Sequence, residues 1–297
     1  MADIYMKKID KLNFIDIQEI QNKYKLKYKD LASYIGNNGK IYLIFKDYST
    51  RPVLAENRIV CLTPDWGKSG GIEHTELLDF SSSFEDIHVI QPIGSKYLIN
   101  SNKSFITFIT DDRGRILRKI DLGLYSTNTC IVDGEDNIIV GYYDEVIFDD
   151  FYEVSSGLIL YDEFGTILWK NEKYDIVNCY ALDVDDGNNI WFYPDDKIIK
   201  VDSRNNYNMY DVGIRFSRGF LFNKLQNKFI FQNISQDENE FLIGQDKFVI
   251  KDFINERPCI FILDGRRHIE VKGFTFRNSK ALLWDRSMLY WFEWNDA

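Results

Sequence analysis

A strand–turn–strand unit recurs six times along the chain, and this repeat constrains the fold more than any other feature. In the first copy, two short runs rich in β-branched and aromatic residues, 31–35 and 41–45, flank a turn at 36–40 that contains two Gly and two Asn. Asn and Gly tolerate the positive φ angles that tight hairpin turns require. The turns of the other copies lie at 92–96, 134–137, 186–189, 225–228 and 277–280.

Additional hairpins lie between the copies of this unit. The clearest covers residues 157–170, where two apolar runs flank a turn that contains Gly165, and similar hairpins are expected near 105–117, 198–210 and 259–269. Each unit then holds up to four short strands over roughly 40–55 residues, which is the size of a propeller blade. Four short strands cannot bury both faces of their sheet alone, whereas radial packing of several sheets buries them. The sequence therefore predicts an all-β fold, a β-propeller of six blades with about four antiparallel strands each.

The two ends of the chain predict how this ring closes. The last unit ends in a third strand, 288–294, with no fourth strand after it. We expect the N-terminal segment 3–14 to supply the missing outer strand and to close the ring. Seven blades are an alternative because residues 240–253 fit the repeat poorly, and a β-sandwich pair or another all-β array is the competing fold. We expect residues 1–297 to form a single propeller domain.

Composition narrows the classes of partner. Aromatic residues make up 15% of the chain, which favours strands because flat rings pack well on a pleated surface. The formal net charge is −10, and the chain shows no Lys and Arg cluster of the kind that a duplex-binding surface needs. Such a protein repels nucleic acid and anionic lipid, and it suits a basic partner, a cation, or simply a soluble state. We therefore expect a monomer that binds neither nucleic acid nor membranes.

The cysteines and the N-terminus predict a cytoplasmic location. The four cysteines are Cys61, Cys130, Cys179 and Cys259, and their spacing contains no C-x-x-C pair of the kind that metal sites use. We expect buried thiols in a reducing compartment. The first residues lack the apolar run of a signal peptide, and no segment approaches the ~18 apolar residues of a membrane span.

Four segments in the middle of the chain resemble a family of uncharacterised bacterial single-domain β-propellers. That family carries a V-Q-P element, a Y-F-D-E-G-V-F type segment, a G-L-x-x-F-D-x-x-G hairpin and a C-Y-A-L-N-V strand. The matching segments here are 89–92, 138–148, 157–169 and 179–184. This chain departs from the pattern at Val146, where the family has Gly, and at Asp183, where it has Asn. The resemblance implies the propeller fold and no activity, because the family has no known function.

The main candidate binding region follows the apolar run 138–141, where acidic and aromatic residues come together. Loops at strand ends are the usual binding positions on such a scaffold. The candidates are Tyr142, Tyr143, Asp144, Glu145, Phe148, Asp149 and Asp150. The carboxylates predict a solvated or loop-ordering acidic rim, with a Ca²⁺ site or an acid–base pair as alternatives. The aromatic rings either pack on the blade or form a binding patch.

Two further positions are candidates for chemistry. Asp185, Gly187 and Asn189 alternate in a way that resembles a calcium loop, but turn formation explains the same residues. Because the D-x-D-x-D-G spacing of calcium loops is absent at 144–150, we assign no metal and no cofactor, and Ca²⁺ remains the alternative. His88 begins an innermost strand, where a propeller lyase would place its base, so it is added to the binding residues.

These observations favour a non-enzymatic binding scaffold. The propeller would present an acidic face with an aromatic rim to a protein partner, and one version is an immunity-type protein that neutralises a basic toxin. The first alternative is a propeller lyase or hydrolase with a polar site at the central channel. The second alternative is a sensor of a small ligand or a metal ion. An enzyme requires His88 or several carboxylates to converge within hydrogen-bond reach.

Overall fold

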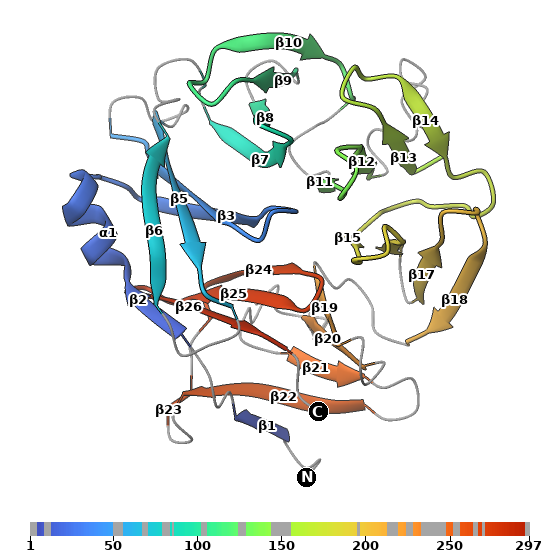
Figure 1. Ribbon diagram of the computed structural model, residues 1–297. Helices are drawn as coiled ribbons and strands as arrows, with labels where there is room; N and C mark the ends of the chain where they lie inside the picture. Colours follow the sequence, from blue (N-terminus) through green and yellow to red (C-terminus); the bar gives the residue numbers. More distant parts are fainter. Residues whose placement is uncertain are drawn as a thin grey trace. The chain divides into compact units, whose positions relative to one another are not determined.

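The protein is an all-β propeller, built from 26 strands and one helix in the described part of a computed structural model (Figure 1). The described residues are 5–8, 13–49, 56–66, 71–78, 84, 86–101, 106–123, 129–143, 156–194, 197–212, 219–223, 228–232, 248–251, 256–263, 267–268 and 271–294. Within these ranges no helix is long and apolar enough to cross a membrane.

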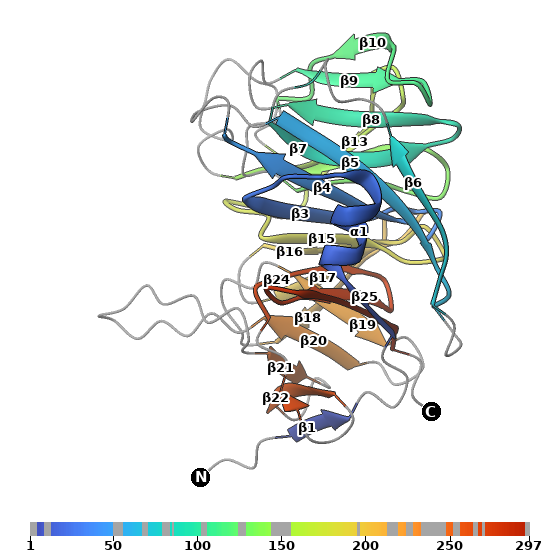
Figure 2. The ribbon, with the colours of Figure 1, turned by 90° about the vertical axis from the view of Figure 1, so that its left-hand side faces the viewer.

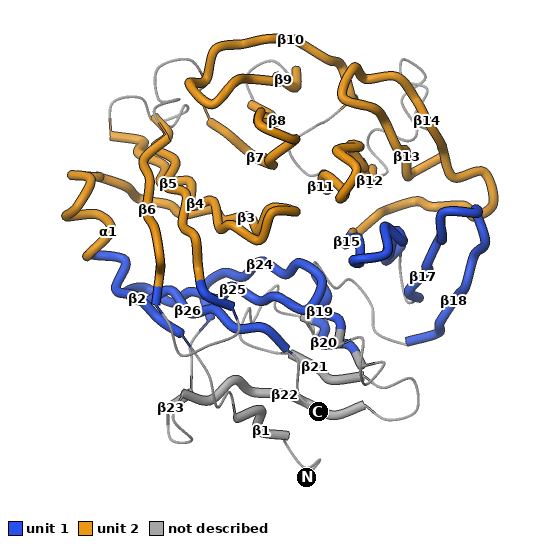
Figure 3. The backbone as a smooth tube through the Cα atoms, in the orientation of Figure 1, with its two compact units in different colours: residues 1–18, 65–71, 183–297 blue, residues 19–64, 72–182 orange. Residues whose placement is uncertain are grey.

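The chain forms two compact units, which Figure 3 colours separately. Unit 1 comprises residues 1–18, 65–71 and 183–297, and unit 2 comprises residues 19–64 and 72–182. The expected single domain stays a prediction.

Unit 2 contains three four-stranded antiparallel sheets in chain order. The first sheet is β3 (Asp30–Ile35), β4 (Ile41–Asp47), β5 (Glu56–Pro64) and β6 (Ile72–Leu78). The second is β7 (Ile87–Ile93), β8 (Lys96–Ser101), β9 (Thr107–Thr110) and β10 (Ile116–Ile120). The third is β11 (Thr129–Val132), β12 (Ile138–Gly141), β13 (Leu158–Tyr161) and β14 (Ile167–Lys170). The first strand of the second sheet, β7, contacts both β3 and β11, so the sheets meet through their first strands.

Unit 1 contains the other sheets, apart from Ala181 and Leu182 of β15 (Ala181–Val184), which belong to unit 2. One consists of β15, β16 (Ile190–Tyr193), β17 (Lys197–Val201) and β18 (Tyr207–Asp211). Another consists of β24 (Gly273–Arg277), β25 (Lys280–Trp284), β26 (Met288–Glu293) and β2 (Asn13–Asp16). The remaining sheet has six strands, namely β19 (Phe220–Asn223), β20 (Lys228–Gln232), β21 (Phe248–Lys251), β22 (Glu256–Leu263), β23 (Arg267–His268) and β1 (Tyr5–Lys8).

The prediction of six blades with four strands each is therefore wrong in its count, because five sheets have four strands and the other has six. The two additional strands of that sheet are β23, which pairs with β22, and β1 from the N-terminal segment. β1 pairs in parallel with β22, whereas β2 pairs antiparallel with β26, with Phe14 opposite Tyr290. A strand edge carries unpaired backbone donors and acceptors, so two nearby edges each recruit part of this segment. Closure of a ring by the N-terminal strand stays a prediction.

A short helix, α1 (Ile17–Tyr24), precedes the first sheet of unit 2. The Asp16 carboxylate accepts a hydrogen bond from the Gln18 amide at 2.7 Å, which caps a helix start. At the other end of the helix, the Tyr24 hydroxyl donates to Thr75 Oγ1 at 2.8 Å. Figures 1 and 2 show α1 beside β6, where this contact fixes it.

The cores lie between consecutive sheets, and the outermost strands carry exposed side chains. Between the second and third sheets, Leu98 and Ile109 pack with Val132, Ile138 and other buried residues. All six residues from 41 to 46 of β4 are buried, whereas most side chains of β10 and β14 are exposed or half-buried. Burial thus decreases from the inner strands to the outer ones, as radial packing of sheets requires.

Five hairpin turns share one construction. Each begins with an Asp whose Oδ1 accepts hydrogen bonds from the backbone amides two and four residues later, at 2.8–3.1 Å. The residue three positions after the Asp has a positive φ between 54° and 84°, and it is Gly, Asn or Asp. The five turns begin at Asp111, Asp133, Asp162, Asp185 and Asp202. The expected hairpin turns at 134–137 and 186–189 are confirmed.

Candidate functional site

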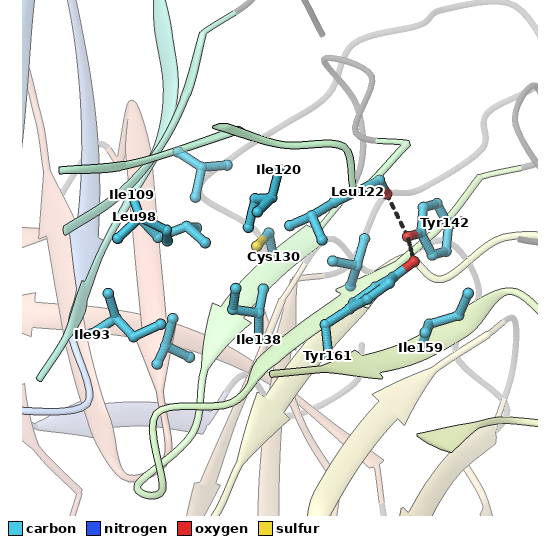
Figure 4. Packing of buried hydrophobic residues seen from close by; sticks show 13 residues of the cluster. Ile93, Leu98, Ile109, Ile120, Leu122, Cys130, Ile138, Tyr142, Ile159 and Tyr161 are labelled. Carbon is cyan, nitrogen blue, oxygen red and sulfur yellow. Dashed lines mark hydrogen bonds between the residues drawn. The ribbon is translucent and has the colours of Figure 1, made fainter. Parts of the chain in front are cut away.

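Tyr142 lies in the core of unit 2. Its side chain is 0% exposed, and its hydroxyl donates to the Leu122 carbonyl oxygen at 2.6 Å and lies 2.7 Å from the Tyr161 hydroxyl (Figure 4). Burial is the main cause that raises the pKa of Tyr142 well above its ordinary value, and the nearby Tyr161 is the second cause. This residue joins the second and third sheets, and its predicted role in binding has no support from this position.

Only Tyr143 of the other predicted residues in this region is described. It is half-buried, and its ring meets that of Tyr180 edge-on, with centroids 5.9 Å apart. The other predicted binding residues of this region lie outside the described residues: Asp144, Glu145, Phe148, Asp149 and Asp150. Their role in binding stays a prediction.

His88 lies in a small polar cluster of unit 2. Its Nε2 is 3.4 Å from Asp86 Oδ2, and the Lys46 ammonium donates to Asp86 Oδ1 at 3.0 Å. Lys46 and Asp86 are buried, whereas the side chain of His88 is 22% exposed. Burial, helped by the Lys46 charge, lowers the pKa of His88, while Asp86 acts in the opposite direction. The imidazole is therefore neutral at neutral pH and able to accept a proton.

This cluster brings one imidazole to one carboxylate, and the carboxylate already neutralises Lys46. The convergence of several carboxylates expected of an enzyme is not seen among the residues described in unit 2 around His88. In the same described part of the chain, no group of three or more His, Cys, Asp and Glu side chains is placed to hold a metal ion.

The calcium-like segment at 185–189 is a hairpin turn. Asp185 accepts hydrogen bonds from the Gly187 amide, from the Asn189 amide and side chain, and from the Trp191 indole. Burial acts to raise the pKa of Asp185, but the bonds from Trp191 and Asn189 outweigh it and hold the pKa below its ordinary value. Because N–H donors already use both carboxylate oxygens, turn formation accounts for the pattern.

Asp183, where the chain departs from the family pattern, connects two sheets of unit 1. Its Oδ1 lies 3.6 Å from Arg277 Nε on β24, and its Oδ2 accepts a hydrogen bond from the Asn278 amide. Burial raises the pKa of Asp183 to about 6, although Arg277 and Asn278 both act to lower it.

Six large apolar side chains are exposed among the described residues of unit 2. One is Val177, and the other five lie on β10, on β14 or in the turn before β14, where none of the sequence motifs predicts exposure. Two Ile–Leu doublets, one at the start of β10 and one at the start of β14, are exposed together with a Phe in the turn before β14. The exposed fractions are 45% for Ile116, 55% for Leu117, 57% for Phe164, 41% for Ile167 and 52% for Leu168. We call these five residues the Ile–Leu surface.

The local backbone explains why both members of each doublet are exposed. The register of β10 with β9 shifts between Ile116 and Arg118, and that of β13 with β14 shifts between Leu160 and Tyr161. Such a bulge inserts one extra residue, so the strict alternation of inward and outward side chains is broken there.

Contacts between the second and third sheets join β10 to the turn that precedes β14. The Arg118 guanidinium lies 4.0 Å from the centre of the Phe164 ring, and its Nη1 donates to the Glu163 carbonyl oxygen at 3.2 Å. Lys96 forms an ion pair with Glu163. The turn before β14 therefore packs on β10. The shared sequence pattern D-x-x-G-x-I-L at 111–117 and 162–168 is the signal that identifies this surface.

Comparisons with known proteins support the fold alone. No family model matches the chain, and no curated protein matches it. A catalytically inactive virginiamycin B lyase from Staphylococcus aureus with quinupristin is 10% identical, with a TM-score of 0.50 over 95% of this chain and 99% of that chain. A DUF4221 family member from Bacteroides vulgatus is 11% identical, with a TM-score of 0.47 over 90% and 92%. YCF48 bound to D1 peptide is 11% identical, with a TM-score of 0.49 over 90% and 79%. The sheet topology and the likeness to the lyase structure together identify the chain as an all-β propeller.

Proposed function

We propose that this propeller is a non-enzymatic interaction scaffold that binds a protein partner through the Ile–Leu surface. The observation that carries the proposal is the exposure of five large apolar side chains, each at least 41% exposed, four on the outer strands of two consecutive sheets and one in the turn before β14. Single exposed apolar residues are ordinary on protein surfaces, whereas a group of them marks an interaction site. The bulges that expose the doublets recur at the same position in both hairpins, so their exposure is built into the backbone.

The energetics of burial support this assignment. Removing apolar surface from water contributes roughly 25 cal/mol per Å², so covering two Leu, two Ile and one Phe side chain supplies a useful share of a binding free energy. Arg118 lies against Phe164 and adds a large side chain with donors at the edge of the surface. Arg and aromatic residues are the groups that most often dominate binding energy at interfaces.

A second function, a propeller lyase or hydrolase, is supported by one observation. His88 is neutral, partly exposed and next to the Asp86 carboxylate. A single imidazole with one neutralised carboxylate provides a proton acceptor and no second group for catalysis within this cluster. The scaffold is therefore the better-supported function.

The finer version of the proposal, a basic partner such as a toxin, has support from the net charge of −10 only. It would use the acidic residues that come after Tyr143. A cytoplasmic location is part of the same proposal, and the free, buried thiols of Cys61, Cys130 and Cys179 support a reducing compartment.

A photo-crosslinking experiment tests the scaffold. Benzoylphenylalanine replaces Leu117 on β10 in the full chain, and a matched variant carries it at Met209 on β18, which is also an exposed apolar residue of an outer strand. In host cells, we expect one discrete protein adduct at position 117 and none at position 209. A His88→Gln variant should give the same adduct, because the polar cluster is not part of the surface. Absence of an adduct at 117, or equal adducts at both positions, contradicts the proposal.

A further inference from the structure

The edge of β10 combines the Ile–Leu doublet with a local excess of positive charge. Residues 113–119 read R-G-R-I-L-R-K and contain four cations and no acid, in a chain whose net charge is −10. Arg113, Arg115 and Lys119 are exposed, and the side chain of Arg115 is 74% exposed. We propose that the part of the partner that docks on β10 is an extended, acidic segment with interspersed apolar residues. This inference rests on the proposed function and names the chemistry of the one segment of the partner that contacts β10.

An extended segment fits because β10 is an edge strand. In the second sheet the order is β10-β9-β8-β7, so within the described residues β10 pairs on one side only. Extended peptides bind exposed sheet edges with main-chain hydrogen bonds, and alternate side chains then supply specificity. The bulge at Ile116–Arg118 twists the strand, which hinders pairing with another rigid sheet. A flexible segment can follow this twist.

The charges exclude a second copy as the favoured occupant. If two copies paired through β10, the cations of 113–119 in one copy would lie opposite the same cations of the other. Like charges directly opposite each other in a sheet are destabilising. Carboxylates of an acidic segment would instead lie near Arg113 and Lys119, and apolar residues between them would cover Ile116 and Leu117.

The contacts of β10 keep part of this charge in place. Arg115 Nε donates to Asp111 Oδ2 at 2.6 Å, and Arg118 is held on the Phe164 ring. The Lys119 ammonium lies 5.8 Å from the centre of the Phe108 ring, and Lys119 is exposed. Because these side chains are held by neighbours in the same sheet or the adjacent turn, less conformational entropy is lost when they bind.

The chain contains its own control for this inference. β14 has the same Ile–Leu doublet after the same Asp turn, but Thr166 and Trp169 stand where β10 has Arg115 and Arg118. Lys170 is the counterpart of Lys119, and it is also exposed. It lies 3.7 Å from Glu172, so its charge already has an acidic neighbour. Charge reversal at 119 and at 170 is therefore a matched pair of variants.

A peptide selection tests the inference. A display library of random ten-residue peptides is selected on the full wild-type chain, and the enriched peptides are labelled and titrated by fluorescence anisotropy in low and high salt. We expect enrichment of Asp and Glu next to apolar residues, with binding weakened by salt. Lys119→Glu should weaken binding by about threefold to fivefold, as expected for one exposed charge contact, and Lys170→Glu by less than about twofold. Urea unfolding confirms that both variants fold.

Several results would overturn the inference. They are enrichment of basic or neutral peptides, no enrichment, equal losses in Lys119→Glu and Lys170→Glu, or a dimer in sedimentation velocity that Leu117→Ser abolishes. The last result assigns β10 to a second copy. An adduct at position 117 combined with a non-acidic selection means that the scaffold stands and the partner chemistry is wrong. Absence of that adduct contradicts the scaffold itself, so the two failures are distinguishable.

Discussion

The hairpins β9–β10 and β13–β14 have the same construction and different surfaces. Both turns begin with an Asp that accepts two backbone amides, place a Gly at positive φ three residues later, and continue into a bulge with an exposed Ile–Leu doublet. The residues between these positions differ, with Arg115 and Arg118 in the first hairpin and Thr166 and Trp169 in the second. The shared residues build the backbone, and the variable ones decide which ligand each strand can attract.

The two hairpins also differ in how they are attached to the core. Tyr161 is the residue before Asp162, and its hydroxyl oxygen lies 2.7 Å from that of Tyr142. The equivalent residue before Asp111 is Thr110, whose Oγ1 is 3.5 Å from the Tyr97 carbonyl oxygen. The second hairpin is therefore fixed by a buried hydroxyl pair that the first lacks. Variants in the two hairpins test this comparison, from the largest expected effect to the smallest.

Substitutions that leave a cavity beside the inner strand of either hairpin should lower the free energy of unfolding the most. Ile109 and Ile159 are buried in the same core cluster, so Ile109→Ala and Ile159→Ala should each lower the free energy of unfolding by about 2–5 kcal/mol. Leu117→Ala and Leu168→Ala, on the exposed outer strands, should change it by less than about 0.5 kcal/mol. Urea unfolding of the four variants measures this contrast. Comparable losses in inner and outer strands would show that the doublets are covered within the protein.

The hydroxyl pair should distinguish the two hairpins. Tyr142→Phe leaves the buried Leu122 carbonyl oxygen and the Tyr161 hydroxyl without this partner, and it should cost about 1–3 kcal/mol. Thr110→Val removes one long hydrogen bond and should cost less. Chemical denaturation gives both values, and near-ultraviolet circular dichroism checks that packing is retained. A larger loss for Thr110→Val would reverse the comparison.

The contact of Arg118 with Phe164 should couple the two hairpins. The guanidinium lies over the ring of an exposed Phe, so the coupling energy should be about 0.5–1 kcal/mol. A double-mutant cycle with Arg118→Gln and Phe164→Leu measures it through urea unfolding. Lys119→Gln with Phe164→Leu is the control, because Lys119 lies over Phe108 instead. A coupling of zero for the first pair means that the Phe164 ring does not help to hold the turn on β10.

Asp111 and Asp162, which begin the two turns, should each make the free energy of unfolding depend slightly on pH. The effect of salt on their pKa values should differ. Burial acts to raise the pKa of both carboxyl groups, but hydrogen bonds outweigh it, so both pKa values lie below the ordinary range. The main donor is the Arg115 side chain for Asp111 and the Thr166 amide for Asp162. A depressed carboxylate pKa stabilises the fold above the unfolded-state pKa of about 3.9, and this contribution is lost as pH falls through the folded-state value.

The nature of these donors determines the salt response. Raising NaCl from about 50 mM to about 500 mM should move the pKa of Asp111 upward more than that of Asp162, because the Arg115 guanidinium is charged and exposed and is therefore screened. Carboxyl NMR titration in the two salt concentrations measures both shifts. Equal shifts would show that backbone amides, and not Arg115, determine the pKa of Asp111.

Much of the fold is predictable from local sequence. Turn residues such as Gly39, Asn38 and Asp185 mark where strands reverse, because backbone conformation at a turn depends on the residue itself. The candidate site is less predictable. The sequence places His88 at the start of an inner strand, but it does not reveal the neighbours Asp86 and Lys46, because Lys46 contacts Asp86 across 40 residues of sequence. The repeated D-x-x-G-x-I-L pattern marks the two Ile–Leu doublets in the sequence, but it does not show that they are exposed, because an apolar run in a strand predicts core.

The sequence by itself determined the strand-and-turn repeat and the all-β propeller class, because hairpin turns and alternating apolar runs are local properties. Only the tertiary structure decided which strands became outer edges, and hence that Leu117 and Leu168 are exposed while Ile109 and Ile159 are buried. It also decided that the N-terminal segment divides between β22 and β26. The physical reason is that burial and strand pairing depend on contacts between distant segments, and a local pattern of side chains is compatible with either outcome.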